Sequence, residues 1–275
     1  MNAPAPSAST ARNVKQLRRS VRRCRLILAF SLTAALGLGT AGCDVAAGWV
    51  AQPVPQTAGA SSQTPTASTD KRSAQDVLGS LPVKGRAPKA GYDREEFGAA
   101  WSDVDRNGCD TRNDILKRDL ENEKFKSGTH DCVILTGVLS DAYTAKTIDF
   151  TRGQRTSTAV QIDHVVALLD AWQSGALQLS AERRRVLAND PLNLQAVDGP
   201  TNGQKQASNA ASWLPPNKAY RCVYVARQIS VKAAYGLWVT KPEKSAMERV
   251  LDSCAGQKAF VTTVPTLPPR TPKHP

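Results

Sequence analysis

The sequence predicts an α+β fold, and three observations support this prediction. Short runs alternate apolar and polar residues, as strands with one buried face do. Other segments repeat apolar residues every three or four positions, as amphipathic helices do. After the first 43 residues the chain has four cysteines, an even number that favours two disulfides in an exported protein. We expect one domain, residues 86–256, that combines both kinds of element.

The first 43 residues have the composition of a secretory leader. Seven Lys or Arg residues and no acidic residue accompany an apolar run from Leu26 to Leu38, which is too short for a membrane span. The small residues before Cys43 suit a signal peptidase and resemble the lipobox of bacterial lipoproteins, although Thr40 stands where Leu is usual. We therefore expect a signal peptide of lipoprotein type with Cys43 acylated, so that the protein faces outward on a cell membrane. Ordinary secretion is the alternative.

Two further segments are expected to be disordered. Residues 44–85 are rich in Ala, Gly, Ser, Thr, Gln and Pro, which is typical of a linker. Residues 257–275 are rich in Pro and Thr and are interpreted as a tail. Neither segment has enough large apolar side chains to offset the entropy lost on ordering.

The net charge of +12 is concentrated at the ends of the chain. The leader holds seven of the 36 Lys and Arg residues, and the tail beyond Gly256 holds three. The remaining 26 stand against 24 acidic residues, so the body of the chain is close to neutral. Bulk charge is therefore a poor argument for nucleic-acid binding, which would need a local basic face.

The cysteines of the body are Cys109, Cys132, Cys222 and Cys254. Sequence alone allows three pairings, and we favour the local ones, Cys109 with Cys132 and Cys222 with Cys254. The spacing contains no CxxC pair, which argues against a structural zinc site.

Two patterns mark the start of the domain. Residues 92–101 favour a short helix that begins at Asp93 and places Phe97 and Trp101 on one face. A loop follows in which oxygen-bearing residues alternate around Gly108, as in a Ca²⁺ loop. Because its last acidic residue is Asp rather than Glu and a Cys takes the seventh place, a turn that caps the next helix is the preferred interpretation. The candidate Ca²⁺ ligands are Asp103, Asp105, Asn107 and Asp114.

Periodicity and capping residues predict the remaining elements. Ser180 is suited to cap one helix, and Thr240 with Glu243 forms a capping box for the last one, which ends near Cys254. The other predicted helices cover residues 111–120, 165–177, 182–188, 210–214 and 218–235, with one more beginning near Asn202. The predicted strands cover residues 133–138, 147–150, 159–164 and 192–197.

Three arginines are candidate phosphate contacts. Arg112 lies in the first turn of the helix over residues 111–120, while Arg152 and Arg155 belong to a short basic loop. A solvated turn explains the loop equally well.

The strand over residues 159–164 ends in Asp163-His164. Alternation puts His164 on one face with Val160 and Ile162, so a buried structural histidine is the simple interpretation. His164 is one of only three histidines, however, and spaced amides and a lysine follow it: Asn193, Asn202 and Lys205. We therefore favour a functional site.

Together these residues resemble the HNH, or ββα-metal, endonucleases. The signature is Asp163-His164, then Asn193, then Asn202 and Lys205 in the frame Asn-x-x-Lys. The similarity is greatest to the branch typified by the C-terminal domain of the GmrSD modification-dependent restriction endonucleases, which includes exported actinobacterial members. It extends through Cys109–Arg112, Val160–Ile162, Trp213–Pro216 and the helical pair that ends at Cys254.

The resemblance implies a ββα-metal (HNH) core with flanking helices and a role for each residue. His164 would be the general base, Asp163 and Asn202 would hold one Mg²⁺ or Mn²⁺ ion, Asn193 would orient His164 and its loop, and Lys205 would stabilise charge on the phosphate. Asn202 stands where the family name expects a second His, a change that some HNH branches share, including the CRISPR effector nucleases. Because neighbours on a regular strand point to opposite faces, we place Asp163 and His164 at the rim of a hairpin.

The expected function is an exported, metal-dependent endonuclease that hydrolyses phosphodiester bonds of DNA, with RNA as a second candidate substrate. A carboxylate and an amide leave several positions for water and phosphate around Mg²⁺, and a neutral His can accept a proton from the attacking water. The competing hypothesis is a non-catalytic cell-envelope module that keeps the fold and binds a wall polymer or a protein. The expected partners are nucleic acid and, through the lipid on Cys43 alone, a membrane.

Overall fold

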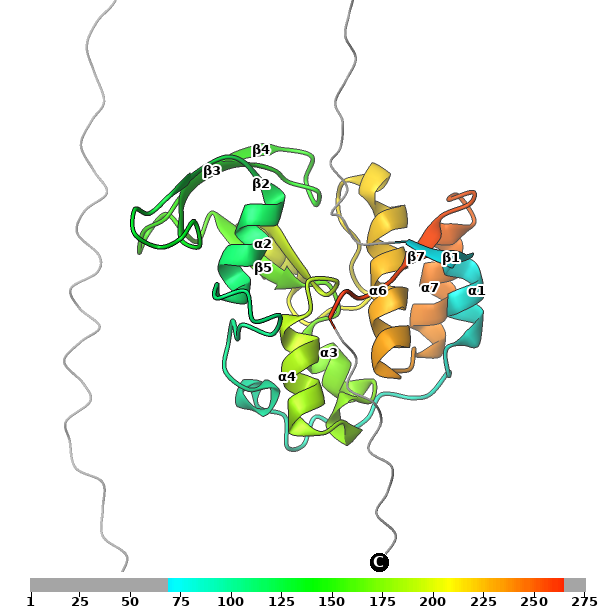
Figure 1. Ribbon diagram of the computed structural model, residues 1–275. Helices are drawn as coiled ribbons and strands as arrows, with labels where there is room; N and C mark the ends of the chain where they lie inside the picture. Colours follow the sequence, from blue (N-terminus) through cyan, green and yellow to red (C-terminus); the bar gives the residue numbers. More distant parts are fainter. Residues whose placement is uncertain (1–68, 265–275) are drawn as a thin grey trace, which may run out of the picture. The chain divides into compact units, whose positions relative to one another are not determined.

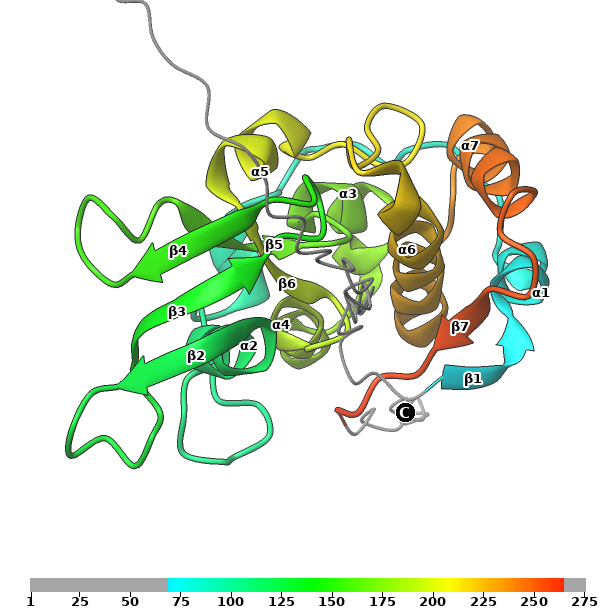
Figure 2. The same ribbon diagram turned by 90° about the horizontal axis from the view of Figure 1, so that it is seen from above.

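The computed structural model describes residues 69–264, which form an α+β unit with three small antiparallel sheets (Figures 1 and 2). The strands are β1 (Thr69–Ser73) paired with β7 (Lys258–Phe260), β2 (Leu120–Phe125), β3 (Ile134–Ser140) and β4 (Thr147–Thr151) in the order β2-β3-β4, and β5 (Val160–His164) paired with β6 (Leu194–Asp198). The helices are α1 (Ala74–Ser80), α2 (Thr111–Asp119), α3 (Leu168–Gln173), α4 (Ala181–Asn189), α5 (Gly199–Lys205), α6 (Arg221–Tyr235) and α7 (Lys241–Leu251). Short 3-10 turns cover Arg94–Phe97, Ala176–Gln178 and Lys218–Tyr220.

The antiparallel pair β5–β6 lies between the β2–β3–β4 sheet and α6 (Figure 2), and it contributes side chains to two hydrophobic cores. One face carries Ile162 and Leu194, which pack with α2 and with the β2–β3–β4 sheet. The other face carries Val197, which belongs to the larger core formed with α6 and α1. In the register of this strand pair His164 lies opposite Leu194, so His164 ends β5, as the sequence predicted.

The folded unit begins earlier and ends later than the sequence suggested, so the predicted linker and tail boundaries need correction. Ser73 and Asp76 form a capping box for α1, and the helix buries Val77 and Leu78 in the larger core. At the other end β7 pairs with β1, and Val264 is buried. A small set of well-placed apolar residues is enough to order a segment whose average composition is that of a linker. The predicted leader, Cys43 and most of the tail lie outside the described residues.

Several local predictions are confirmed. Ser180 accepts a hydrogen bond from the backbone of Arg183 at the start of α4, and the Thr240–Glu243 capping box starts α7. Both favoured disulfides are present: Cys109 with Cys132, and Cys222 with Cys254. The second joins the start of α6 to the chain just after α7, as a covalent bond between two helices should.

Three elements differ from expectation. Residues 92–101 form only the 3-10 turn Arg94–Phe97, because the backbone turns away at Gly98 with a φ of +76°. Residues 210–214 form turns without a helix. The strand β2 was missed, because its alternation is mostly between charged and polar residues and it lies at the edge of its sheet.

A buried ionic cluster fastens α6 and α7 to α3. The Lys232 ammonium lies 3.1 Å from Asp170 Oδ2 and 2.8 Å from Glu243 Oε1, and all three side chains are nearly inaccessible to solvent. Lys232 compensates the charge of both carboxylates, and Arg86 lies 3.4 Å from Asp170 Oδ1 as a second cation, so the cluster fixes how the helices pack. Within residues 69–264 no helix has the length and apolar character needed to cross a membrane.

The corrected boundaries predict different stabilities for two versions of the domain. A protein of residues 69–264 should unfold cooperatively, whereas residues 86–256 alone lose the burial of Val77 and Leu78, about 1.5–3 kcal/mol each, and the β1–β7 pair. Thermal and urea unfolding of both would measure the difference. Equal stability of the shorter protein would show that β1, α1 and β7 are dispensable.

Candidate active site

The candidate site is built on a strand–strand–helix unit, β5, β6 and α5. Asp198 ends β6, and its side chain caps α5 by accepting a hydrogen bond from the Thr201 amide. The helix therefore follows the strand directly and folds back onto the β5–β6 pair. Gly199 is required at this corner, because a Cβ there would lie 2.0 Å from the Thr158 carbonyl oxygen. The α5 side chains therefore meet one face of β5.

Asp163 points to the α5 face of β5 and has polar partners on both carboxylate oxygens. Lys205 Nζ lies 3.0 Å from Oδ1, and the Tyr143 hydroxyl donates to Oδ2 at 2.6 Å. Lys205 Nζ also donates to the backbone carbonyl of His164 at 2.8 Å. Lys205 is 0 % exposed and Asp163 5 %, so this is a fully desolvated ion pair whose partners depend on each other. Burial and the Asp163 charge raise the pKa of Tyr143 well above its ordinary value, so it stays a donor.

Asn202 lies one step along the same interface, but it does not share a ligand position with Asp163. Its Nδ2 donates to Gln161 Oε1 at 2.9 Å, and Gln161 and Asp163 are alternate residues on one face of β5. A divalent ion at Asp163 would compete with the Lys205 ammonium for the same oxygen. Within residues 69–264 no three His, Cys, Asp or Glu side chains are grouped to hold a metal. The contacts of Asp163 therefore argue against the predicted ion, whereas Asn202 Oδ1, the atom that would bind it, has no partner within residues 69–264; the shared ion stays a prediction.

His164 points to the opposite face from Asp163, and the structure fixes its tautomer. Nε2 lies 2.9 Å from the Ala188 carbonyl oxygen, near the end of α4. A carbonyl can only accept, so Nε2 carries the proton and donates it, and Nδ1 keeps a lone pair. The pKa of His164 is lowered from 6.5 to about 3, chiefly by burial; the positive charges of Arg94 and Lys205 contribute to this lowering, while the hydrogen bond to the Ala188 carbonyl opposes it. The imidazole is therefore neutral over the whole physiological range.

Asn193 holds the backbone that follows His164. Its Oδ1 accepts the Val166 amide at 2.8 Å, and its Nδ2 donates to the carbonyls of Val166 and Leu187, both at 3.3 Å. Its own backbone carbonyl accepts the Val165 amide at 2.7 Å. Asn193 is wholly buried and so links the turn after β5 to the end of α4, where the His164 partner lies.

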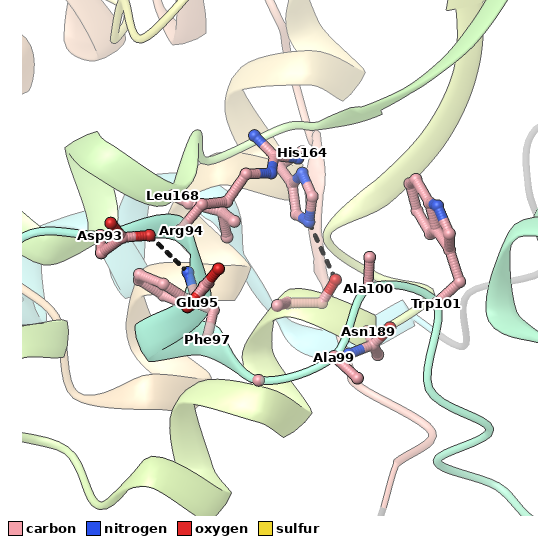
Figure 3. A pocket seen from close by; sticks show the side chains of 12 residues that line it. Asp93, Arg94, Glu95, Phe97, Ala99, Ala100, Trp101, His164, Leu168 and Asn189 are labelled. Atoms are coloured by element: carbon pink, nitrogen blue, oxygen red, sulfur yellow. Dashed lines mark hydrogen bonds between the residues drawn. The ribbon is translucent and has the colours of Figure 1, made fainter.

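The His164 imidazole forms part of the wall of a cavity of about 410 Å³ (Figure 3). The segment from Asp93 to Trp101 covers one side, and Leu168, Ala188 and Asn189 close the other. The Trp101 indole lies nearly parallel to the imidazole, at 17°, with ring centroids 6.3 Å apart. His164 is only 7 % exposed, but it faces this cavity and is not enclosed by aliphatic side chains alone.

The three candidate arginines have different environments. Arg152 is used structurally: it donates to the carbonyl of Ile134 and to Asn113 Oδ1. Arg112 is half-buried, and burial together with the neighbouring charge of Arg152 lowers its pKa. Arg155 is exposed. The structure does not join these arginines to His164 in one site.

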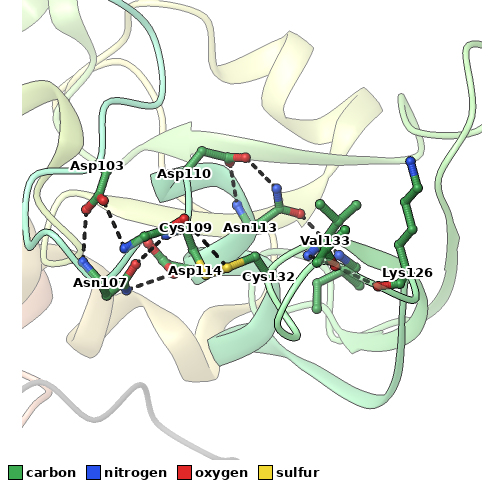
Figure 4. Close-up of a disulfide and its surroundings, with 12 residues drawn as sticks. Asp103, Asn107, Cys109, Asp110, Asn113, Asp114, Lys126, Cys132 and Val133 are labelled. Atoms are coloured by element: carbon green, nitrogen blue, oxygen red, sulfur yellow. Dashed lines mark hydrogen bonds between the residues drawn. A yellow bond between two sulfur atoms is a disulfide. The ribbon is translucent and has the colours of Figure 1, made fainter.

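The predicted Ca²⁺ loop is a hydrogen-bonded turn (Figure 4). Asp103 accepts the amides of Asn107 and Gly108, and the Asn107 side chain donates to Asp105 and Asp114. Burial, opposed by the Asn107 hydrogen bond, raises the pKa of Asp114. These carboxylates accept hydrogen bonds from the backbone and from the Asn107 amide, as in the turn that was the preferred interpretation. The residue that caps α2 is Asp110, which was not expected.

Sequence reasoning missed the main partners of the predicted residues. Tyr143 lies in a turn between β3 and β4 and carries no motif, yet it fixes Asp163. The partner of His164 is a backbone carbonyl, which no residue type reveals. Trp101 was assigned to a helix face, although a backbone φ of +59° turns it toward His164. A tryptophan next to the Asp-rich loop was the only signal that the sequence offered.

The low pKa of His164 predicts a loss of stability in acid. In the unfolded chain His164 takes up a proton below about pH 6.5, whereas the folded state resists protonation until about pH 3. The contribution of His164 to the free energy of unfolding is therefore fully present above pH 6.5. It falls by up to about 1.4 kcal/mol per pH unit as the pH is lowered from 6.5 to 3. His164→Gln should flatten this slope relative to the exposed control His130→Gln, measured by urea unfolding at pH 4–7. Equal slopes in both variants would contradict the buried, neutral assignment.

Comparison with known proteins places this geometry in a family. The family model described as GmrSD restriction endonucleases, C-terminal domain, matches residues 110–250. A protein of Arthroderma benhamiae described as an uncharacterized secreted protein is 35 % identical over 192 residues, which cover 69 % of this chain and 87 % of the relative. No solved structure matches. Residues 110–250 include every strand and helix that positions Asp163, His164, Asn193, Asn202 and Lys205, and the chain belongs to the family of GmrSD restriction endonuclease C-terminal domains.

Proposed function

We propose that this protein is an exported endonuclease that hydrolyses phosphodiester bonds of DNA, with His164 as the general base. The observation that carries the proposal is the His164 imidazole itself: it is neutral, its tautomer is fixed by the Ala188 carbonyl, and it lines a cavity at the end of β5. The family supports a nuclease, and the two disulfides and the secreted relative support export. A lipid anchor at Cys43 belongs to the same proposal and lies outside the described residues.

The fixed tautomer gives His164 a defined chemical task. The Nδ1 lone pair can accept a proton from an attacking water, while the Nε2–H bond to Ala188 stabilises the imidazolium that results. Burial keeps the imidazole unprotonated but makes it a weak base. A phosphate entering beside it brings negative charge, which raises the pKa of His164 toward the range where proton transfer is efficient.

In this proposal Asn193 and Lys205 hold other groups in place and do not contact the substrate. Asn193 holds the turn after His164 against the end of α4, which keeps the imidazole and its Ala188 partner in register. Lys205 was expected to contact the phosphate, but its buried ammonium holds Asp163 and the His164 carbonyl. It therefore fixes the end of β5 rather than meeting the substrate.

The metal requirement stays a proposal that the observed side-chain positions do not favour. Both Asp163 oxygens have protein partners, although Asn202 pairs with Gln161 only through Nδ2, which leaves its Oδ1 without a partner within residues 69–264. The same observation favours the second candidate, a non-catalytic envelope module that keeps this fold. The two functions differ in one readout, the breaking of phosphodiester bonds.

His164→Gln should lower the rate of DNA cleavage by at least about 10²-fold, because a general base contributes roughly 10²–10⁴-fold. Gln keeps a donor for the Ala188 carbonyl, so the fold should survive, and circular dichroism checks this. Cleavage of plasmid, single-stranded DNA and RNA by residues 69–264 is the measurement, with His130→Gln as the matched control. Wild-type protein that leaves all three substrates intact would favour the binding module.

Removal of divalent ions tests the family expectation separately. The family expectation is that protein dialysed against a chelator loses cleavage and regains it with added Mg²⁺ or Mn²⁺. The contacts of Asp163 with Lys205 and Tyr143 predict instead that no ion binds at this carboxylate. Cleavage that persists unchanged in the chelator would contradict metal dependence while leaving His164 as the base.

A further inference from the structure

The cavity beside His164 is larger and more apolar than a site for one water and one phosphate group needs to be. We propose that it holds one unstacked nucleobase of the substrate, with Trp101 as its stacking surface. This inference rests on the proposed nuclease function and names the substrate form that the site selects, which is single-stranded nucleic acid.

The two rings that face this cavity are nearly parallel, as the two sides of a stacking site are. The Trp101 and His164 planes differ by 17° and their centroids are 6.3 Å apart, a distance that includes sideways offset. Successive stacked bases lie about 3.4 Å apart, so a base between two rings needs the ring planes about 7 Å apart. We therefore expect Trp101, which is half-buried and belongs to the segment after Gly98, to move when a base enters (Figure 3). Phe97 and Leu168 supply apolar walls, as in most small-ligand sites.

A buried acceptor in the same cavity wall lacks a donor. Asn189 is 1 % exposed, and its Nδ2 donates to the Arg185 carbonyl at 2.9 Å, which fixes the orientation of the amide. Its Oδ1 is buried and has no hydrogen-bond partner within residues 69–264. Buried acceptors are normally satisfied, so we expect this oxygen, which is inaccessible in the present conformation, to become accessible when a ligand that brings an N–H group enters. The amino groups of adenine, cytosine and guanine are such donors.

The charges around the opening separate the phosphate from the base. Arg94 lines the cavity beside His164 (Figure 3), and within the described part of the chain its guanidinium makes no ion pair or hydrogen bond. Asp93 and Glu95 also line it, and the Glu95 backbone amide donates to Asp93 Oδ1 at 2.9 Å. Carboxylates repel a phosphate, so the strand backbone should pass on the Arg94 side, next to the imidazole. Glu95 then stands as a second acceptor for base N–H groups.

The consequence is a preference for unpaired nucleotides. A base inside a duplex cannot enter a cavity without losing its pair and its stacking, which is least costly for single strands. Aromatic stacking of this kind tolerates every base, so the site should select strandedness more than sequence.

The experiment measures binding of a labelled single-stranded oligonucleotide to residues 69–264 in chelator, by fluorescence anisotropy. Trp101→Leu keeps apolar bulk but removes the stacking face, and should weaken binding about tenfold, whereas Trp101→Phe should stay within about threefold of wild type. Affinity for a hairpin duplex should be unchanged by either substitution. Thermal unfolding of each variant shows whether the fold is kept.

An abasic series makes the test specific to one base. Oligonucleotides that lack a single base should reveal one position at which the missing base weakens binding to the wild-type protein about tenfold. At that position the missing base should not weaken binding to Trp101→Leu, compared with the binding of this variant to the intact oligonucleotide. Wild-type affinity of Trp101→Leu, or equal sensitivity at every position, would overturn the inference. If the protein cleaves plasmid but no single missing base weakens binding, the nuclease function stands and the base site is rejected. If one missing base weakens binding but no substrate is cleaved, the base site stands and the nuclease function is rejected.

Discussion

The alternation of side chains along β5 is the constraint on which the rest of the site depends. Asp163 and His164 are consecutive residues at the end of β5, so their side chains point to opposite faces of the strand. Asp163 faces α5 and His164 faces the cavity. Each then meets an environment that suits it. The carboxylate is matched by the Lys205 ammonium and the Tyr143 hydroxyl, while the imidazole is held neutral against a carbonyl.

Burial decides the chemistry on both faces. An isolated carboxylate or ammonium at the depth of Asp163 or Lys205 would be strongly destabilising, so each requires the other. The pair in turn fixes the carbonyl of His164 and the position of α5. On the cavity face the same exclusion of water lowers the pKa of His164. The region is therefore organised around one neutral imidazole and one internal ion pair.

Much of the fold follows from local signals in the sequence. The capping box of Thr240 and Glu243, the Ser180 cap and the separation of the cysteines each have a direct physical reading, and all three are confirmed. The failures have a common cause. Residues 69–85 and β2 have few apolar side chains, and tertiary pairing orders them where composition and periodicity give little signal.

The contacts of the candidate site could not be predicted from the sequence. Spacing and the family resemblance selected Asp163, His164, Asn193 and Lys205, which lie in one region of the fold; their roles stay a prediction. Their partners are a tyrosine from a distant turn and a backbone carbonyl at a helix end, which spacing cannot reveal. Asp163 pairs with Lys205 and Asn202 Nδ2 pairs with Gln161, contacts that the sequence did not predict; the shared ion between Asp163 and Asn202 stays a prediction.

The most direct test of this account is the protonation state of His164, measured by ¹⁵N NMR of the histidine side chains between pH 4 and 8. We expect a neutral ring protonated on Nε2 throughout that range, as burial and the Ala188 carbonyl require. A titration midpoint near the ordinary value of 6.5, or a proton on Nδ1 of the neutral ring, would contradict it.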